Sequence, residues 1–202
     1  PVEKRVETGG RVGPHIEVKI VDEEGAPVDR GVQGELLVRG YPVMQGYWDM
    51  PEKTGEAIDA DNWMHSGDLA TMDADGYVQI TGRIKDMVIR GGENIYPREI
   101  EEFLYEHPDI ADVQVIGVPD EKYGEELMAW IILEEDAVTD RRTLTAEDIR
   151  AFSDGKLAKF KIPRYVHITE SFPMTISGKV RKVEMREKAI GILGLYTYGR
   201  ES

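Results

Sequence analysis

At two places in the chain, a charged residue directly follows a glycine and could bind the hydroxyl or phosphate groups of a ligand. Asp68 follows Gly67, and its carboxylate oxygens can accept hydrogen bonds from both vicinal hydroxyls of a ribose. Lys179 follows Gly178 and brings an ammonium that can stabilise negative charge developing around phosphorus. Arg83 adds a permanently charged fork of N–H donors for a hydroxyl or phosphate oxygen. Taken alone, each also fits an ordinary role as a turn brace, a solvated lysine or a surface ion pair.

The stretch from residue 80 to 97 separates two kinds of sequence. Lys85 and Asp86 place two solvated charges between apolar, strand-like pieces, which suits an exposed crossing between two bodies. Gly91 and Gly92 allow positive φ or a close approach of the backbone to a ligand. We therefore interpret this stretch as a hinge followed by a ligand loop, although short connectors of this composition are also common.

Composition excludes several classes of function. Asp and Glu outnumber Lys and Arg by 39 to 25, and the net charge of −14 argues against non-specific binding to nucleic acid or anionic membranes. The absence of cysteine excludes disulfides, thiolate metal sites and a cysteine nucleophile. We recognise no signal peptide and no apolar run of the ~18 to 20 residues that a membrane span needs, so we expect a soluble, cytoplasmic protein.

One segment departs from the acidic average. Residues 156–188 contain nine Lys or Arg and three Glu, so this region is locally positive. Anionic ligands could bind there, although a basic surface exposed to solvent explains the same composition.

Hydrophobic periodicity predicts a β-rich first part and an α/β second part. In the first part we expect strands at residues 16–20, 35–39, 69–72 and 77–80, and a short helix at 52–58. In the second part we expect strands at 112–118, 127–133 and 165–169, and helices at 98–107, after Thr145, and at 180–195. Asp73–Gly76 predicts a hairpin turn, and the unbroken apolar run at 127–133 indicates a strand buried on both faces.

Three motifs, taken in order, resemble those of the adenylate-forming (AMP-binding) enzymes, which activate carboxylic acids with ATP. Residues 65–69 (HSGDL) resemble the family's aromatic-basic-Thr-Gly-Asp-Leu motif, residues 82–97 its hinge motif, and residues 174–179 (MTISGK) its C-terminal lysine motif. The sequence GGENIYP in the hinge motif, together with FPMT at 172–175, is most similar to medium-chain fatty acyl-CoA synthetases. The departures from the family pattern are Ser66 for Thr, Asn62 for Gly and Met174 for Lys.

The resemblance implies an α+β fold in two parts. Residues 1–84 would form the C-terminal β subdomain of the large N-terminal adenylation domain, a distorted β-barrel. Residues 85–202 would form the mobile C-terminal α/β domain, with a three-stranded sheet and helices. The family's phosphate loop, acidic magnesium residue and acyl pocket lie upstream of the matched motifs. We therefore expect this chain to be a C-terminal fragment that is inactive alone.

The resemblance also implies roles for individual residues. Lys179 would be catalytic in adenylate formation, and Asp68 and Arg83 would bind the nucleotide. Lys85 falls at the hinge position, about which the C-terminal domain rotates between the two half-reactions. The residues implied to face the channel for the pantetheine arm of CoA are Gly91, Gly92 and Glu93.

The expected reaction makes an acyl-adenylate from ATP and a fatty acid or other carboxylic acid, and then the CoA thioester. The expected ligands are ATP or AMP and CoA; Mg²⁺ is expected for the full-length enzyme, with no ligands in this chain. The missing N-terminal portion of the polypeptide, and a second copy of the chain, are the expected protein partners. Two alternatives stay open: an adenylation enzyme that loads an aryl or amino acid onto a carrier protein, and a non-enzymatic nucleotide-binding module.

Overall fold

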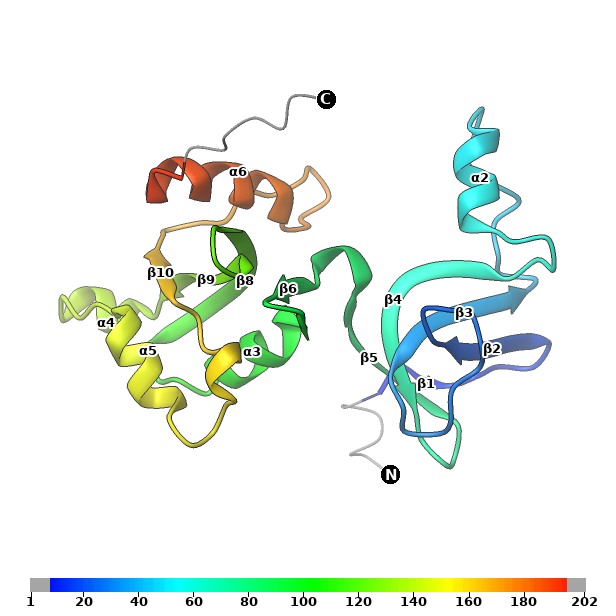
Figure 1. The fold of residues 1–202 in the computed structure, drawn as a ribbon, viewed down its shortest axis with the longest axis horizontal. Coiled ribbons are helices and arrows are strands. Elements are labelled where there is room, and N and C mark those ends of the chain that lie inside the picture. The colour runs from blue at the N-terminus through cyan, green and yellow to red at the C-terminus, as the bar shows by residue number, and fades with distance from the viewer. Residues whose placement is uncertain (1–7, 196–202) are drawn as a thin grey trace. The chain divides into compact units, whose positions relative to one another are not determined.

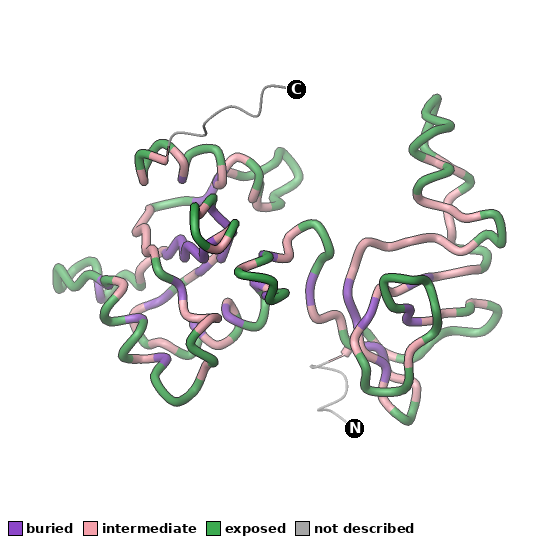
Figure 2. The backbone as a smooth tube through the Cα atoms, viewed as in Figure 1, coloured by how far each residue is buried: buried purple, intermediate pink, exposed green. Residues whose placement is uncertain are grey.

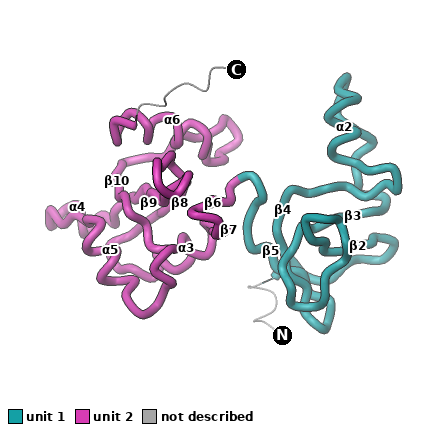
Figure 3. The backbone as a smooth tube through the Cα atoms, viewed as in Figure 1, with its two compact units in different colours: residues 1–85 teal, residues 86–202 magenta. Residues whose placement is uncertain are grey.

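A computed structural model of the chain describes residues 8–195. The chain divides between Lys85 and Asp86 into two compact units, called unit 1 and unit 2 below (Figure 3). The strands are β1 (Gly10–Arg11), β2 (Ile16–Val21), β3 (Gly34–Gly40), β4 (Met64–Met72), β5 (Tyr77–Arg83), β6 (Val88–Arg90), β7 (Glu93–Ile95), β8 (Ile110–Asp120), β9 (Gly124–Leu133) and β10 (Tyr165–Ile168) (Figure 1). The helices are α2 (Pro51–Ala57), α3 (Pro97–Leu104), α4 (Glu135–Thr139), α5 (Ala146–Ser153) and α6 (Lys182–Leu193), with short 3₁₀ turns η1 (Ile84–Asp86) and η2 (Lys159–Lys161).

Unit 1 is built on one antiparallel sheet of five strands in the order β1-β5-β4-β3-β2. The predicted hairpin is confirmed: β4 and β5 pair, and the Asp73 side chain accepts hydrogen bonds from the backbone of Asp75 and Tyr77 in the turn. The expected barrel is wrong for the described residues, where the sheet stays open. Its edge strands β1 and β2 do not pair with each other, and β1 offers only Gly10 and Arg11 for pairing.

Unit 2 contains a second sheet of five strands, in the order β10-β9-β6-β7, with β8 on β9. The three strands expected from the sequence are β8, β9 and β10, and β10 runs parallel to β9. The expectation of three strands is wrong because β6 and β7 extend the sheet. The two glycines between Arg90 and Glu93, which we interpreted as a ligand loop, also form the turn of a tight hairpin.

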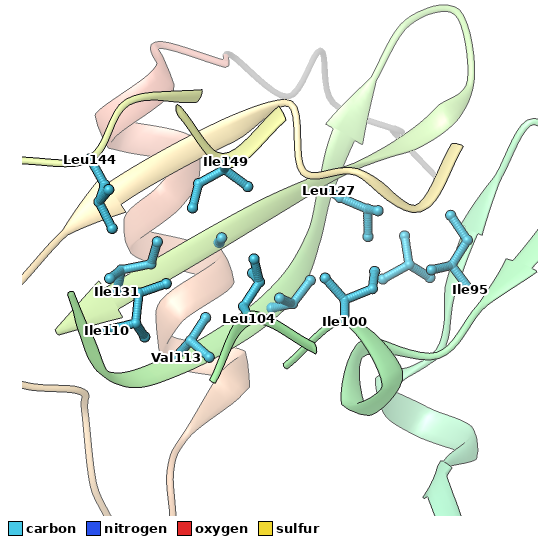
Figure 4. Packing of buried hydrophobic residues seen from close by; sticks show 12 residues of the cluster. Ile95, Ile100, Leu104, Ile110, Val113, Leu127, Ile131, Leu144 and Ile149 are labelled. Carbon is cyan, nitrogen blue, oxygen red and sulfur yellow. The ribbon is translucent and has the colours of Figure 1, made fainter. Parts of the chain in front are cut away.

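The core of unit 2 lies on both faces of β9, as the continuous apolar run predicted. Leu127, Ala129 and Ile131 belong to a cluster that includes residues of α3 and α5 (Figure 4). Met128 and Trp130 belong to a second cluster with residues of α6. Figure 2 colours residues along the central strands of unit 2 as buried, and others in the sheet of unit 1. Alternate residues of one strand therefore hold helices on opposite sides of the sheet.

Helix termini follow local chemistry. The predicted N-cap of α5 is confirmed, since Thr145 Oγ1 accepts from Asp148 N at 3.3 Å and Asp148 Oδ2 accepts from Thr145 N at 2.8 Å. Helix α3 ends before the expected His107, consistent with the exclusion of helical backbone ahead of a proline. Helix α6 begins after the expected Val180, which forms a β-bridge instead. None of the described helices combines the length and apolarity needed to cross a membrane.

Removing the side chain of Ile149 should destabilise unit 2. This residue is fully buried in the α5 cluster, so Ile149→Ala leaves a cavity and should lower the free energy of unfolding by about 2–5 kcal/mol in urea denaturation. The control is Ile192→Ala on α6, where 49% of the residue is exposed. Equal effects from the two variants would contradict this account of the core.

Candidate active site

Asp68 lies on an irregular part of β4. The pairing of β4 with β3 shifts register between Glu35 and Leu37, and its pairing with β5 shifts between Leu69 and Ala70. Gly67, just before Asp68, has φ +69°, a conformation that glycine adopts without strain. The strand therefore bends at this point, as bulged strands do where they aim a side chain.

Two side chains brace the backbone ahead of Asp68. Glu35 on β3 accepts from Gly67 N through Oε1 at 3.1 Å, and its Oε2 lies 2.9 Å from His65 Nδ1. Ser66 Oγ donates to Leu36 O at 2.6 Å and accepts from Asp68 N at 3.0 Å. Sequence reasoning missed Glu35, for which the available signal was a carboxylate directly before the three apolar residues of β3.

Asp68 and Arg83 are brought together by the β4–β5 pairing, where they are direct partners. Arg83 Nε donates to Asp68 Oδ1 at 2.8 Å. Among residues 8–195, Oδ2 of Asp68 has no hydrogen-bond donor. The side chains are 25% and 52% exposed, respectively, and an ion pair this open contributes little to stability. The pair thus presents a free acceptor and a cation to solvent.

Lys179 lies in a short hairpin that leads into α6. The hairpin is closed at its base by Arg181 N donating to Pro173 O at 2.8 Å, and by a β-bridge between Met174 and Val180. Within it, Thr175 N donates to Lys179 O at 2.8 Å, and Lys179 N donates to Thr175 Oγ1 at 2.9 Å. We call residues 173–181 the lysine hairpin. Its internal hydrogen bonds fix the backbone from which the lysine projects.

The ammonium of Lys179 has no carboxylate partner among the described residues, and the residue is exposed. Several neighbouring basic side chains do have one. The ion pairs of this region are Lys161 with Glu99, Arg164 with Asp120, Arg181 with Glu184, Lys182 with Glu101, and Lys188 with Glu184. In a chain with a net charge of −14, a cation held on an ordered hairpin without an ion-pair partner is available to an anionic ligand.

Gly91 and Gly92 form the two-residue turn between β6 and β7. Their φ angles are +60° and +89°, the signs that a type I′ hairpin turn requires, so the sequence prediction of positive φ is confirmed. Gly91 N donates to Tyr123 O at 2.8 Å, and a Cβ on Gly91 would lie 3.2 Å from Tyr123 Cδ1. Glu93 follows the turn and is exposed. The turn therefore holds its backbone close to the Tyr123 ring.

Lys85 occupies the centre of η1, the 3₁₀ turn that links β5 to β6. It is exposed, and the boundary between the two units falls directly after it. The turn contains no buried residue, so side-chain packing does not fix its backbone dihedrals.

A cavity of about 760 Å³ in unit 2 opens beside the β6–β7 turn. Its lining includes Arg90, Tyr123, Lys159 and Arg164. Arg90 lies 4.1 Å from the centre of the Tyr123 ring, a cation–π arrangement. Lys159 and Arg164 belong to the basic segment 156–188 noted in the sequence, whereas Arg90 and Tyr123, which the sheet brings to the same place, were missed.

A buried carboxylate supports the floor of this cavity. Glu126 is 1% exposed and accepts from Arg90 Nε at 2.6 Å and from Arg90 Nη2 at 2.9 Å. The hydrogen bond from Arg90 to Glu126 raises the pKa of the guanidinium above its usual value. Arg90 is consequently oriented and charged at any physiological pH.

No cluster of three or more His, Asp or Glu side chains in residues 8–195 is arranged so that it could hold a metal ion. No step below depends on Mg²⁺.

Two family models match the chain. The model of the AMP-binding enzyme matches residues 1–48, and that of the AMP-binding enzyme C-terminal domain matches residues 99–179. The "Putative acyl-CoA synthetase YngI" of Bacillus subtilis (strain 168) is 55% identical over 95% of this chain and 34% of its own length. The "Medium-chain acyl-CoA ligase ACSF2, mitochondrial" of Bos taurus is 50% identical over 93% of this chain and 30% of its own. The chain thus spans about a third of these relatives.

Solved structures of similar fold also carry nucleotides. ATP-bound MatB from Rhodopseudomonas palustris matches with a TM-score of 0.84 and 37% identity, over 92% of this chain and 36% of that one. The o-succinylbenzoate CoA synthetase MenE from Bacillus subtilis, in complex with its acyl-adenylate intermediate, matches with a TM-score of 0.80 and 28% identity, over 91% of this chain and 36% of that one.

A methyl group on the first glycine of the β6–β7 turn should be costly. Gly91→Ala forces an L-residue into the left-handed region and presses Cβ against Tyr123, so we expect a loss of at least about 1–2 kcal/mol of unfolding free energy in urea denaturation. Gly92→Ala is the matched control, because its Cβ would meet nothing within 4 Å and only the backbone strain remains. A smaller loss for Gly91→Ala than for Gly92→Ala would contradict the contact with Tyr123.

Proposed function

Because this chain belongs to the AMP-binding enzyme family, we propose that it is the C-terminal part of an acyl-CoA synthetase. The intact enzyme makes an acyl-adenylate from ATP and a carboxylic acid, and then transfers the acyl group to CoA. The observation that carries the proposal is Lys179, an exposed cation on an ordered hairpin with no carboxylate partner among the described residues. The relatives named above, of which this chain spans about a third, support the choice of reaction.

In the first half-reaction, a carboxylate oxygen of the acid attacks the α-phosphorus of ATP. A new P–O bond forms, the bond to the β-phosphate oxygen breaks, and pyrophosphate leaves. Two anions approach each other and charge accumulates on the phosphoryl oxygens, so a fixed ammonium lowers the barrier electrostatically. Lys179 is the residue proposed to supply it.

Asp68 and Arg83 are proposed to hold the nucleotide during this step. Oδ2 of Asp68 is left without a donor by the residues described and can accept from a ribose hydroxyl, while Oδ1 is oriented by Arg83. The brace of Glu35 and Ser66 fixes the backbone of Asp68 before the ligand arrives, which reduces the entropy lost on binding.

In the second half-reaction, the thiol of CoA attacks the acyl carbonyl. The thiol loses its proton, a C–S bond forms, the bond between the acyl carbon and the phosphate oxygen breaks, and AMP leaves. This step has no need of a cation at the α-phosphate, and it needs a path for the pantetheine arm. The small residues Gly91 and Gly92, with Glu93 beside them, are proposed to line that path, because a turn without Cβ atoms lets the arm approach the backbone.

The cavity beside this turn is proposed to receive the nucleotide end of CoA. The ring of Tyr123 offers a stacking face for adenine, and basic side chains of the lining lie where phosphates could be neutralised. Arg90 is already bound to Glu126, so its main contribution is to orient the tyrosine ring. Arg90 and Arg164 are already paired with carboxylates, and Glu147 and Asp154 also line the cavity, so Lys159 and Arg150 are the cations proposed to meet the phosphates.

Lys179 is proposed to act in adenylation alone. In the intact enzyme, Lys179→Ala should slow ATP–pyrophosphate exchange by at least about 100-fold, because the placed positive charge is lost. Thioester formation from supplied acyl-adenylate should be unchanged. Lys188→Ala, which removes an exposed cation paired with Glu184 on α6, is the control and should leave both steps intact. Equal losses in both half-reactions would refute the assignment.

Lys85 is proposed as the pivot between the two half-reactions. Lys85→Pro removes a backbone N–H, fixes φ and disfavours the 3₁₀ conformation of Ile84. Thioester formation from supplied acyl-adenylate should slow by about tenfold or more, while adenylation is retained. Lys85→Ala removes the side chain alone and should change neither rate by more than about threefold. An unaltered thioesterification rate in Lys85→Pro would count against a hinge at this residue.

A further inference from the structure

A partly buried ion pair involves Lys182, the residue that follows the lysine hairpin. Lys182 Nζ donates to Glu101 Oε1 at 2.6 Å and to Val115 O at 3.2 Å. The side chains of Lys182 and Glu101 are only 14% and 13% exposed. This is one of the least exposed ion pairs among the described residues, and it has no role in the reaction proposed above.

The pair is anchored to the edge of the second sheet. Glu101 Oε1 also accepts from Val115 N at 2.8 Å, so the two charged side chains together satisfy both the N–H and the C=O of one β8 residue. Among the described strands, β8 pairs only with β9, where Val115 lies opposite Ala129. The ion pair therefore takes the place of a neighbouring strand at this point of the edge.

Lys182 stands at the junction between the lysine hairpin and α6. It is the first residue of α6, next to Arg181, whose backbone closes the hairpin on Pro173, and three residues after Lys179. Since the hairpin is ordered by its own hydrogen bonds, the position of its base determines where the Lys179 side chain points.

Helix stability does not account for a cation at this position. A positive side chain in the first turn is unfavourable to the helix dipole, which favours anions there. A buried ion pair also contributes little net stability compared with apolar side chains of similar volume, because both charges lose their hydration. Such a pair does fix the orientation of both side chains, because each charge loses its hydrogen-bond partner if either side chain moves away.

We propose that Lys182, through its ion pair with Glu101, is a positioning residue for Lys179. The pair fixes the base of the lysine hairpin to β8 and to α3, the helix that follows the β6–β7 turn. The inference rests on the proposed function of Lys179, because Lys182 is proposed to hold Lys179 in the position that adenylation requires. Lys182 itself touches no substrate.

The test compares half-reactions in the intact enzyme. Lys182→Met keeps most of the unbranched side chain and removes its ammonium; it should slow ATP–pyrophosphate exchange by about 10- to 100-fold, the effect of misplacing a catalytic group. The KM for ATP and the rate of thioester formation from supplied acyl-adenylate should stay within about threefold of the native values. Lys182→Arg, which keeps the cation, should recover most of the lost exchange rate.

Glu101→Gln combined with Lys182→Met removes both charges and guards against a folding defect caused by leaving one of them buried alone. If the two residues act as a unit, this double variant should be as slow in exchange as Lys182→Met. The surface control is Lys188→Met, which should match the native enzyme. All rates are measured well below the thermal midpoint of each variant.

Native exchange in folded Lys182→Met, or in the folded double variant, would overturn the proposal. Equal losses in both half-reactions would overturn it as well, since they would indicate a purely structural role. Lys179→Ala, measured in parallel, distinguishes the proposed function of Lys179 from the positioning role of Lys182. If Lys179→Ala keeps native exchange, the proposed function is refuted. If Lys179→Ala loses exchange while the Lys182 variants keep it, only the positioning role is refuted.

Discussion

Strand β9 is buried on both faces, and the packing of unit 2 depends on this constraint. Leu127, Ala129 and Ile131 pack toward α3 and α5, while Met128 and Trp130 pack toward α6. A strand in this position cannot change register without moving apolar residues of one cluster into the other. The loops that carry the candidate residues of unit 2 are therefore attached to elements held by a single rigid strand.

Polar interactions then place the candidate residues on that apolar frame. The lysine hairpin is closed by backbone bonds and anchored by Lys182, and the β6–β7 turn is held by the bond from Gly91 N to Tyr123 O. In unit 1 the brace of Glu35 has the same role for Asp68. Lys179 is exposed and the Asp68 side chain is 25% exposed, whereas the supporting side chains of Glu101, Lys182 and Glu35 are 13%, 14% and 18% exposed. Such an arrangement suits binding, because the ordering cost is met during folding.

Ion pairing distinguishes some basic side chains of this region from others. Five of the nine basic residues in segment 156–188 pair with carboxylates, so the local excess of basic residues found in the sequence is partly neutralised in the structure. Lys179, like Lys156, Lys159 and Arg186, has no carboxylate partner among the described residues; it differs in lying on a hairpin that is closed by its own hydrogen bonds. A count of basic residues could not distinguish these cases, since pairing depends on which carboxylates the fold brings within reach.

The sequence by itself determined the features that depend on local patterns. The apolar run of β9, the Asp73 turn, the Thr145 cap and the positive φ of Gly91 all follow from residue types and their spacing. It also located Asp68, Arg83 and Lys179 through their motifs, whose roles stay proposals. Only the tertiary structure decided the rest. The open first sheet, the two added strands of the second, the brace at Glu35, the pairing of Arg90 with Glu126 and the bond between Glu101 and Lys182 all join residues distant in the chain. Such contacts depend on register and packing, which local periodicity does not encode.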